Sequence, residues 1–336
     1  MADYNLIGLS QPGGNTDDRA AGAKLLSCRF GSPVSPERVI VSNGTQAALH
    51  LLFRNFSGPG KTVLSEGLSY GVLKAVACQA GVSLRGISLD TEGLAVDALR
   101  DSLVDQGPKP GLLYCNPTVH NPTTATMSQE RRLAIADIAR SQSIQIIEDD
   151  VLGLLHPESP PPIAALAPDI TWYVMGLTKC IAHGTRIAYL VAPDEGAAKS
   201  LLEMELRYSS WFPAPLQAAL TRLWIDDGTA AAIAAAIRAE MDSRHDIARQ
   251  VLSGQKYRGS RGSMHIWLSL PKGWSADTFA DAAAANGVLV RPARLFAVDD
   301  NFGTDEIRIS LSSPPNRSSL IDGLSILAGL LADRPI

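Results

Sequence analysis

The sequence has few cysteines, no long apolar run and no excess of basic residues. Its four cysteines, Cys28, Cys78, Cys115 and Cys180, lie far apart and form no Cys-x-x-Cys pair. This spacing argues against a disulfide framework or a zinc site and predicts reduced thiols. No apolar stretch approaches the ~20 residues of a membrane-spanning helix. The 30 basic and 34 acidic residues leave a net charge of -4, so neither a membrane surface nor a nucleic acid is an expected partner.

The composition is that of a folded protein with more than one domain. Hydrophobic residues make up 46% of the chain and charged residues 19%, which is too apolar for a disordered protein. A length of 336 residues predicts two domains, at roughly 100–200 residues per domain. Residues 1–5 (MADYN) have neither the basic nor the apolar region of a signal peptide, so we expect a cytoplasmic protein.

Short apolar, β-branched runs alternate with helical segments between residues 39 and 192. Runs that are apolar throughout are typical of strands buried on both faces, as in a parallel sheet covered by helices. We therefore predict an α/β fold with a seven-stranded, mainly parallel sheet and helices on both of its faces. The seven runs are residues 39–41, 62–64, 84–87, 112–114, 144–147, 172–175 and 187–191.

After Pro193 the pattern changes to longer helices and fewer strands. Residues 215–252 are rich in Ala, Leu and Ile, with charges at helical spacing and a break near residues 226–228. This half predicts a smaller α+β domain, with strands expected at residues 264–268, 288–290 and 306–310. The expected division of the chain is an N-terminal segment over residues 1–34, a large domain over 35–235 and a small C-terminal domain over 236–336.

Polar residues follow several of the predicted strands. In an open α/β sheet, ligands bind beyond the carboxyl ends of the strands, so these residues are predicted to meet at one edge. After the first strand, residues 42–46 (SNGTQ) lead into a helix expected over residues 47–56. Such a glycine turn presents backbone N–H groups and a positive helix end, which suits a phosphate. Taken alone it is a weak signal, because the same residues fit a simple helix cap by Asn43. The other polar runs are residues 116–124, 148–150 and 176–179, followed by Arg186.

The order of these motifs resembles that of the fold type I pyridoxal-phosphate-dependent enzymes of the class I/II aminotransferase family. Residues 121–123 (NPT), 148–150 (EDD) and 308–310 (RIS) are similar to the asparagine loop, the acidic strand end and the late arginine motif of that family. Residues 182–186 (AHGTR) stand where the family has a proline-glycine-arginine stretch. The resemblance covers nearly the whole chain. It is strongest to the aminotransferase-like domains related to MocR-type regulators, without their winged helix.

The resemblance implies pyridoxal 5'-phosphate as the cofactor and gives each motif a role. Lys179 would be the catalytic residue and would hold the cofactor as a Schiff base. Asp149 would pair with the ring nitrogen, and Asn121 would hydrogen-bond the phenolic oxygen. The residues implied for the cofactor phosphate are Gly44, Thr45, Gln46, Thr178 and Arg186.

Two further residues are implied beside the ring and the substrate. Tyr70 stands where the family has an aromatic ring stacked on the cofactor, although a tyrosine here also fits a core position. Arg308 would bind the α-carboxylate of an amino acid in a two-pronged pair, with an ordinary surface ion pair as the alternative.

Histidines and carboxylates give no metal-binding pattern, so no metal is expected. His120 and His183 flank the cofactor motifs and are candidates for contact with the substrate. The remaining histidines are expected on helix faces or at the surface: His50, His156, His245 and His265.

The sequence departs from the family pattern at five positions. Leu9 and Leu152 stand where the family has tyrosines near the cofactor. Thr178 replaces the serine before the lysine, His183 replaces a proline, and Thr124 replaces the glycine that ends the asparagine loop. The two absent phenol groups keep other reactions of the same cofactor open.

We therefore predict a pyridoxal-phosphate-dependent aminotransferase that transfers the amino group of a small α-amino acid to a 2-oxo acid through Lys179. The resemblance also implies a homodimer. One alternative is another reaction of the same cofactor on an amino acid: elimination, decarboxylation, racemisation or a specialised biosynthetic step. The other alternative is a non-catalytic domain that senses amino acids.

Overall fold

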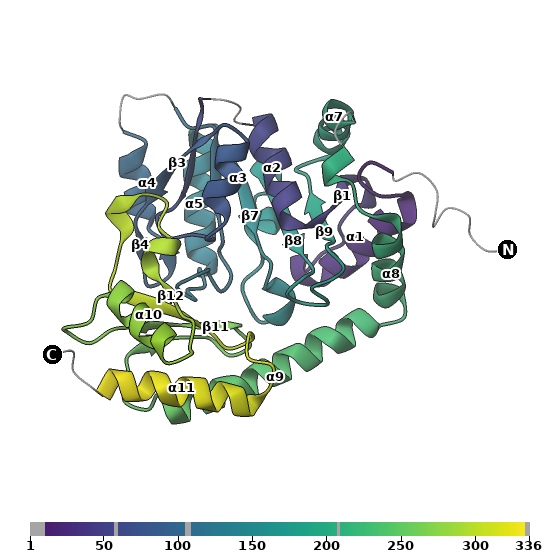
Figure 1. Cartoon of the computed structure of the whole chain (residues 1–336). Coiled ribbons are helices and arrows are strands. Elements are labelled where there is room, and N and C mark those ends of the chain that lie inside the picture. Colours follow the sequence, from purple (N-terminus) through teal and green to yellow (C-terminus); the bar gives the residue numbers. More distant parts are fainter. Residues whose placement is uncertain (1–10, 57–59, 105–108, 207–208, 333–336) are drawn as a thin grey trace.

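A seven-stranded sheet forms the centre of the larger part of the molecule (Figure 1). The computed structural model describes residues 11–56, 60–104, 109–206 and 209–332. The strand order is β1-β9-β8-β7-β6-β2-β3; β9 runs antiparallel to both of its neighbours and every other pair is parallel. The predicted sheet is thereby confirmed. Its strands are β1 (Val39–Ser42), β2 (Thr62–Glu66), β3 (Ser83–Ile87), β6 (Leu112–Cys115), β7 (Gln145–Asp149), β8 (Thr171–Gly176) and β9 (Ala188–Val191).

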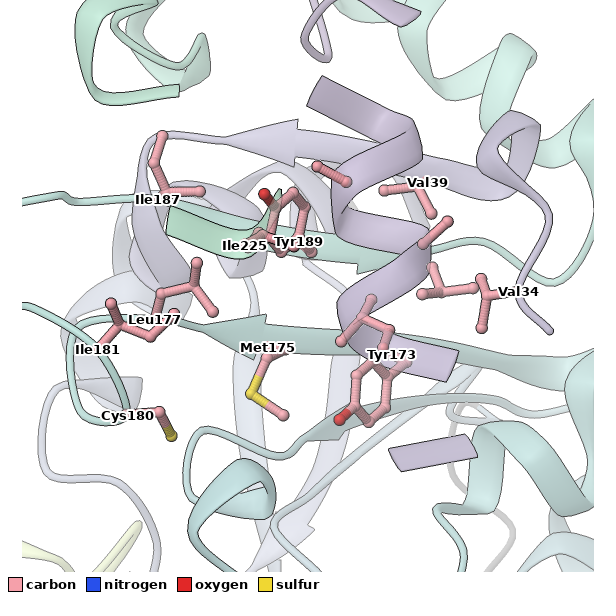
Figure 2. Close-up of a cluster of buried hydrophobic side chains, with 14 of the residues drawn as sticks. Val34, Val39, Tyr173, Met175, Leu177, Cys180, Ile181, Ile187, Tyr189 and Ile225 are labelled. Atoms are coloured by element: carbon pink, nitrogen blue, oxygen red, sulfur yellow. The ribbon is translucent and has the colours of Figure 1, made fainter. Parts of the chain in front are cut away.

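Helices cover both faces of this sheet because successive residues of each strand point to opposite sides. In β1, Val39 and Val41 belong to one buried cluster, whereas Ile40 belongs to the cluster on the other face. Figure 2 shows part of the first cluster, to which β8 and β9 contribute Tyr173 and Tyr189. The helices are α1 (Thr16–Phe30), α2 (Gly44–Phe56), α3 (Leu73–Gln79), α4 (Val96–Ser102), α5 (Gln129–Ser141), α6 (Ile163–Leu166), α7 (Glu195–Glu205) and α8 (Pro215–Asp226).

A smaller α+β unit follows the sheet domain along the chain. Its four antiparallel strands have the order β10-β11-β13-β12, and one face of this sheet packs with three helices around a separate buried cluster. The yellow and light green elements of Figure 1 show this unit beside the larger sheet. Its elements are α9 (Thr229–Val251), β10 (Tyr257–Arg258), β11 (His265–Ser269), α10 (Ala276–Ala285), β12 (Arg291–Pro292), β13 (Glu306–Ser310) and α11 (Arg317–Ala332).

The strand predicted at residues 288–290 is wrong. Val288 and Val290 pack against the cluster of the small unit, but pairing with β13 occurs only at Arg291 and Pro292. The apolar pattern in this segment reflects burial and not strand pairing. By contrast, the predicted break between two helices is confirmed, because Gly228 has a φ of 86° and stands between α8 and α9.

Backbone contacts join the small unit to the large sheet domain. The N–H of Ser69 donates to the carbonyl of Phe296 (2.8 Å), and the N–H of Val298 donates to the carbonyl of Gly67 (2.9 Å). These bonds hold the segment before β13 against the turn that follows β2. In the described part of the chain, no helix is long and apolar enough to cross a membrane.

Candidate active site

Lys179 lies in the turn that follows β8, at the carboxyl edge of the large sheet. The N–H of Leu177 donates to the carbonyl of Ile187 (3.0 Å), and the N–H of Ile181 donates to the carbonyl of Leu177 (2.9 Å), which fixes this turn. The lysine side chain is open to solvent within a cavity. The protein around it still lowers the pKa of its amine by desolvation, and the charge of Arg308 lowers that pKa further. A lowered pKa raises the fraction of neutral, nucleophilic amine.

Asp149 ends β7 and is buried. Its Oδ2 accepts a hydrogen bond from the hydroxyl of Tyr114 (2.8 Å), whereas its Oδ1 has no partner among the described residues. Burial raises the pKa of this carboxyl to about 7, while the hydrogen bond from Tyr114 acts in the opposite direction. A buried carboxyl group with an unpaired oxygen is suited to hold a cationic group in the cavity, because a nearby positive charge favours its ionised form.

The loop after β6 carries Asn121. The side chain of Asn116 donates to the backbone carbonyl of Asp149 and accepts a hydrogen bond from the N–H of Asn121 (2.8 Å). Thr124 has a φ of 62°, the left-handed conformation that usually requires glycine, and the Asn121–Pro122 peptide is cis. The loop is therefore tied to the strand end that carries Asp149, and the backbone keeps the family's glycine-like turn although the residue is threonine.

The turn between β1 and α2 lies against the segment that carries Arg186. Gly44 has a φ of 82°, and the carbonyl oxygen of Arg186 lies 3.6 Å from the position that a Cβ on Gly44 would take. The side-chain amide of Gln46 donates to the hydroxyl of Tyr70 (3.0 Å). The first turn of α2 presents backbone N–H groups at a positive helix end, with Arg186 beside them. This arrangement suits a phosphate.

A cavity of about 170 Å³ lies where these strand ends meet. Its walls contain all nine residues that the sequence predicts for the cofactor, together with His183. Sequence reasoning missed two other wall residues, Tyr114 near the end of β6 and Val151 just after β7. Asn116, also in the wall, begins the polar run at residues 116–124 that was expected at this edge, but it had no predicted role. The nine predicted residues are Gly44, Thr45, Gln46, Tyr70, Asn121, Asp149, Thr178, Lys179 and Arg186.

A second cavity, of about 740 Å³, shares Tyr70, Asn121 and Lys179 with the first and extends to Arg308 on β13. The Nε of Arg308 has no hydrogen-bond partner, and no carboxylate of the described chain lies within ion-pair distance of its guanidinium. Burial lowers the pKa of Arg308 to about 10, with a smaller contribution from the charge of Arg291. An arginine held in this way, with no anion of its own, is suited to bind a carboxylate.

The positions that depart from the family pattern lie in different places. Leu9 lies outside the described residues. Leu152 belongs to the buried cluster that also contains Tyr173 and Tyr189 and does not line the smaller cavity, whereas His183 does. His120 is buried, and its Nδ1 makes a 2.8 Å hydrogen bond with the hydroxyl of Thr123.

Three histidines expected on helix faces or at the surface are buried instead: His156, His245 and His265. His245 does lie on a helix, but its Nε2 makes a 2.9 Å hydrogen bond to the backbone carbonyl of Ser263. Such a partner lets the ring enter the interior, and no sequence pattern reports it. Across the described residues, no group of three or more histidine, cysteine, aspartate or glutamate side chains could hold a metal ion.

Comparisons with known proteins identify the family of this chain. The family model "Aminotransferase class I and II" matches residues 8–324. The chain is 29% identical over 316 residues to the uncharacterized HTH-type transcriptional regulator YdeF of Bacillus subtilis, covering 93% of this chain and 67% of that protein. It is 27% identical to aromatic-amino-acid aminotransferase 1 of Thermococcus litoralis, covering 84% of this chain and 70% of that protein.

A solved structure shares the fold over almost the whole chain. The crystal structure of an archaeal alanine:glyoxylate aminotransferase superposes with a TM-score of 0.88 at 26% identity, covering 98% of this chain and 84% of that one. The family match, the shared fold and the cavity at the strand ends lead to one conclusion. This chain belongs to the class I and II aminotransferases, a family of fold type I transferases whose cofactor is pyridoxal phosphate.

Proposed function

We propose that this chain is an aminotransferase that moves the amino group of a small α-amino acid to a 2-oxo acid, with Lys179 as the covalent anchor of pyridoxal phosphate. One observation carries the proposal. Lys179 and Tyr70 line both cavities of the site. The smaller cavity is also lined by Asp149 and the first turn of α2, and the larger one is also lined by Arg308. A cofactor and a carboxylate-bearing substrate could therefore meet at the lysine.

The residues of the smaller cavity fit the cofactor. Asp149 is buried and its Oδ1 has no hydrogen-bond partner among the described residues. A protonated ring nitrogen would pair with this oxygen. Asn121 would bind the phenolic oxygen, and the face of Tyr70 would cover the ring. The bound cofactor would supply an aldehyde that takes up the amino group and a ring that withdraws the electrons left on the α-carbon when its proton is removed. The phosphate would be held by Gly44, Thr45, Gln46, Thr178 and Arg186.

Lys179 would carry the proton that amino transfer requires. Its amine, with a pKa lowered by desolvation and by Arg308, is a suitable base for the proton on the α-carbon of the substrate. The same amine would then deliver that proton to the cofactor. Arg308 would hold the α-carboxylate in a bidentate pair and so fix which bond of the α-carbon faces the lysine.

A single-turnover experiment tests this proposal. The holoenzyme is mixed with a panel of amino acids without a 2-oxo acid acceptor, and the products are quantified. Amino transfer should release one 2-oxo acid per bound cofactor and no ammonia. Release of ammonia in repeated turnovers would indicate elimination, release of CO₂ a decarboxylase, and formation of the D-enantiomer a racemase. Each of these results would replace the proposed reaction.

The match to an HTH-type regulator over 93% of this chain favours a second candidate, a domain that senses amino acids. In that case an amino acid would bind at Arg308 and Lys179 without turnover. The same experiment distinguishes the two functions, since a sensor would change its absorbance on binding but release no 2-oxo acid.

Assembly and location are part of the proposal. We propose a homodimer, supported by three exposed leucines along α8, Leu216, Leu220 and Leu223. A cytoplasmic location is supported by four free cysteines, two of them exposed. We also keep the predicted division of the chain into an N-terminal segment (residues 1–34), a large domain (35–235) and a small domain (236–336). The boundary between the last two would fall within α9, whose Ala230 packs in a cluster of the large sheet and whose Ala248 packs in the cluster of the small unit.

A further inference from the structure

Two arginines stand opposite each other on neighbouring strands of the small sheet. Arg291 of β12 pairs in register with Arg308 of β13. Directly opposite residues of an antiparallel pair project from the same face, and like charges there are destabilising. Neither guanidinium forms an ion pair with a described residue, although Arg258 and Arg294 nearby in the fold both do. The chain thus keeps a repulsive pair with no carboxylate to neutralise it.

Both arginines line the larger cavity with Lys179. Within the described chain, the walls of this cavity contain these three cations and no aspartate or glutamate. The arginines lie beside Leu295 and Phe296, which give the cavity an apolar side next to its charged one. A pocket lined by charge of one sign raises the local concentration of ligands of the opposite sign.

A single α-carboxylate does not balance this charge. In the proposed function it would occupy Arg308, and the amino group would be directed to Lys179 and the cofactor. Arg291 would then remain as an unpaired cation on the same face. Its Cα lies about 4.5–5.5 Å from that of Arg308, the separation of opposite residues in an antiparallel pair. A short chain bearing a second carboxylate can therefore reach Arg291 while the first is bound to Arg308.

We propose that Arg291 binds the side-chain carboxylate of a dicarboxylic amino acid or 2-oxo acid, which makes acidic amino acids the substrate class of this site. This inference rests on the proposed function for the role of Arg308. It adds a specificity-determining residue on the edge strand of the same chain. The apolar walls at Leu295 and Phe296 would contact the methylene groups between the two carboxylates.

The test compares acidic substrates with their neutral amides. For the holoenzyme, kcat/KM is measured with L-aspartate and L-glutamate and with L-asparagine and L-glutamine, which have nearly the same shape without the charge. The dissociation constant of glutarate, which cannot react, is measured by calorimetry. The variants are Arg291→Gln, Arg291→Lys and the control Arg294→Gln, whose side chain is exposed, pairs with Asp277 and does not line the cavity.

We expect the wild type to prefer the acids over the amides by at least tenfold. Arg291→Gln should lower kcat/KM for the acids and weaken glutarate binding by ten- to a hundredfold, while the amides change less than threefold. Arg291→Lys should keep part of the preference, and Arg294→Gln should keep all of it. Because Arg291 is exposed, melting temperatures should stay close to the wild type.

The outcomes separate this inference from the proposed function. Equal losses for acids and amides in Arg291→Gln, or a wild type that prefers amides, would overturn the role of Arg291 and leave amino transfer intact. Glutarate binding that depends on Arg291, with no 2-oxo acid released from any amino acid, would overturn amino transfer and support the dicarboxylate site. If glutarate binding does not depend on Arg291 and no amino acid releases a 2-oxo acid, both the dicarboxylate site and amino transfer would be overturned.

Discussion

Lys179 differs from an ordinary surface lysine in its electrostatic surroundings. It forms no ion pair with a described carboxylate, and its strongest charged neighbour is another cation, Arg308. By contrast, the amine of Lys74 on α3 donates to the carbonyl of Ala297 (3.2 Å) and stays outside both cavities. Lys179 therefore has both the lowered pKa and the open approach that a nucleophilic amine needs.

Reduction with borohydride should attach the cofactor permanently to Lys179. Peptide mapping of the reduced holoenzyme is expected to show the pyridoxyl mass on the peptide that contains this residue. Lys179→Ala should retain cofactor through the other cavity residues but lose turnover by several orders of magnitude, because nucleophile and base are removed together. Lys74→Ala is the matched control and should keep both label and activity. A label on any other lysine would refute the assignment.

Burial of Asp149 makes the stability of the cofactor-free protein depend on pH. The pKa of this carboxyl is raised from 3.8 to about 7, mainly by burial. Below pH 3.8 the group is protonated in folded and unfolded chains alike and has no effect. As the pH rises to 7, the unfolded chain loses the proton first, so the free energy of unfolding falls. Above pH 7 the penalty is complete, at about 4 kcal/mol at most.

Asp149→Asn should remove this penalty in the cofactor-free protein. The free energy of unfolding of the variant, measured with urea, is expected to exceed that of the wild type by a margin that grows between pH 4 and pH 7.5. Saturation with cofactor should reverse the order at pH 7.5, since only the carboxylate can pair with a cationic ring. A margin that does not change with pH would show that Asp149 is ionised in the empty cavity.

At the level of elements, the proposed phosphate cradle (Gly44, Thr45, Gln46, Thr178 and Arg186) depends on how closely β8 approaches α2. Thr45 Oγ1 occupies the space that a Cβ at Gly176 would need, so the glycine that ends β8 allows the first turn of α2 to pack against it. Gly184 lies nearby in the chain, in the segment before Arg186, and has no atom within 4 Å of an added Cβ. The two glycines therefore differ in what an alanine would disturb.

Gly176→Ala should displace Thr45 and weaken cofactor binding by at least tenfold, with the fold retained. Gly184→Ala should bind cofactor like the wild type. The double variant Gly176→Ala, Thr45→Ala should bind no worse than Thr45→Ala alone, because the clash has been removed. Fluorescence titration of the four cofactor-free variants measures their affinity for the cofactor. If the two glycine variants behave alike, Gly176 does not position the cradle.

The same elements show what the sequence can and cannot predict. Continuous apolar runs predicted all seven strands of the large sheet, since burial on both faces leaves a direct mark on composition. The residues that follow these strands were predicted to meet because parallel strands end at one edge. Tyr114 was missed because its hydrogen bond to Asp149 depends on β6 lying beside β7. The sequence of either strand alone does not predict which strand is its neighbour. The pairing of Arg291 with Arg308 depends on register in the same way.

The whole molecule places its larger cavity between its two parts. Lys179 and Tyr70 come from the sheet domain, whereas Arg308 and Leu295 come from the small unit. The backbone bonds of Ser69 and Val298 hold these walls together. The proposed substrate site therefore depends on how the two parts are docked, because its walls come from elements of both.

The exposed leucines of α8 lead to a prediction about assembly. Leu216 and Leu223 are 60% and 57% exposed, and with Leu220 they follow the i, i+4, i+7 spacing of one helix face. Full burial of one leucine side chain stabilises by about 1.5–3 kcal/mol. A two-fold symmetric dimer would bury the three leucines of both subunits, so this contribution counts once for each subunit. If this face is the dimer interface, a charge at both ends of it should abolish association while the subunit stays folded, because the side chains lie outside the core.

Light scattering should give the wild type twice the 35.7 kDa mass of one chain. The variant with Leu216→Glu and Leu223→Glu should give the mass of one chain, with an unchanged circular dichroism spectrum. Val104→Glu, at a residue 79% exposed and outside α8, is the matched control and should remain dimeric. A double variant that stays dimeric would move the interface to another face. A wild type that is monomeric at micromolar concentration would contradict the homodimer itself.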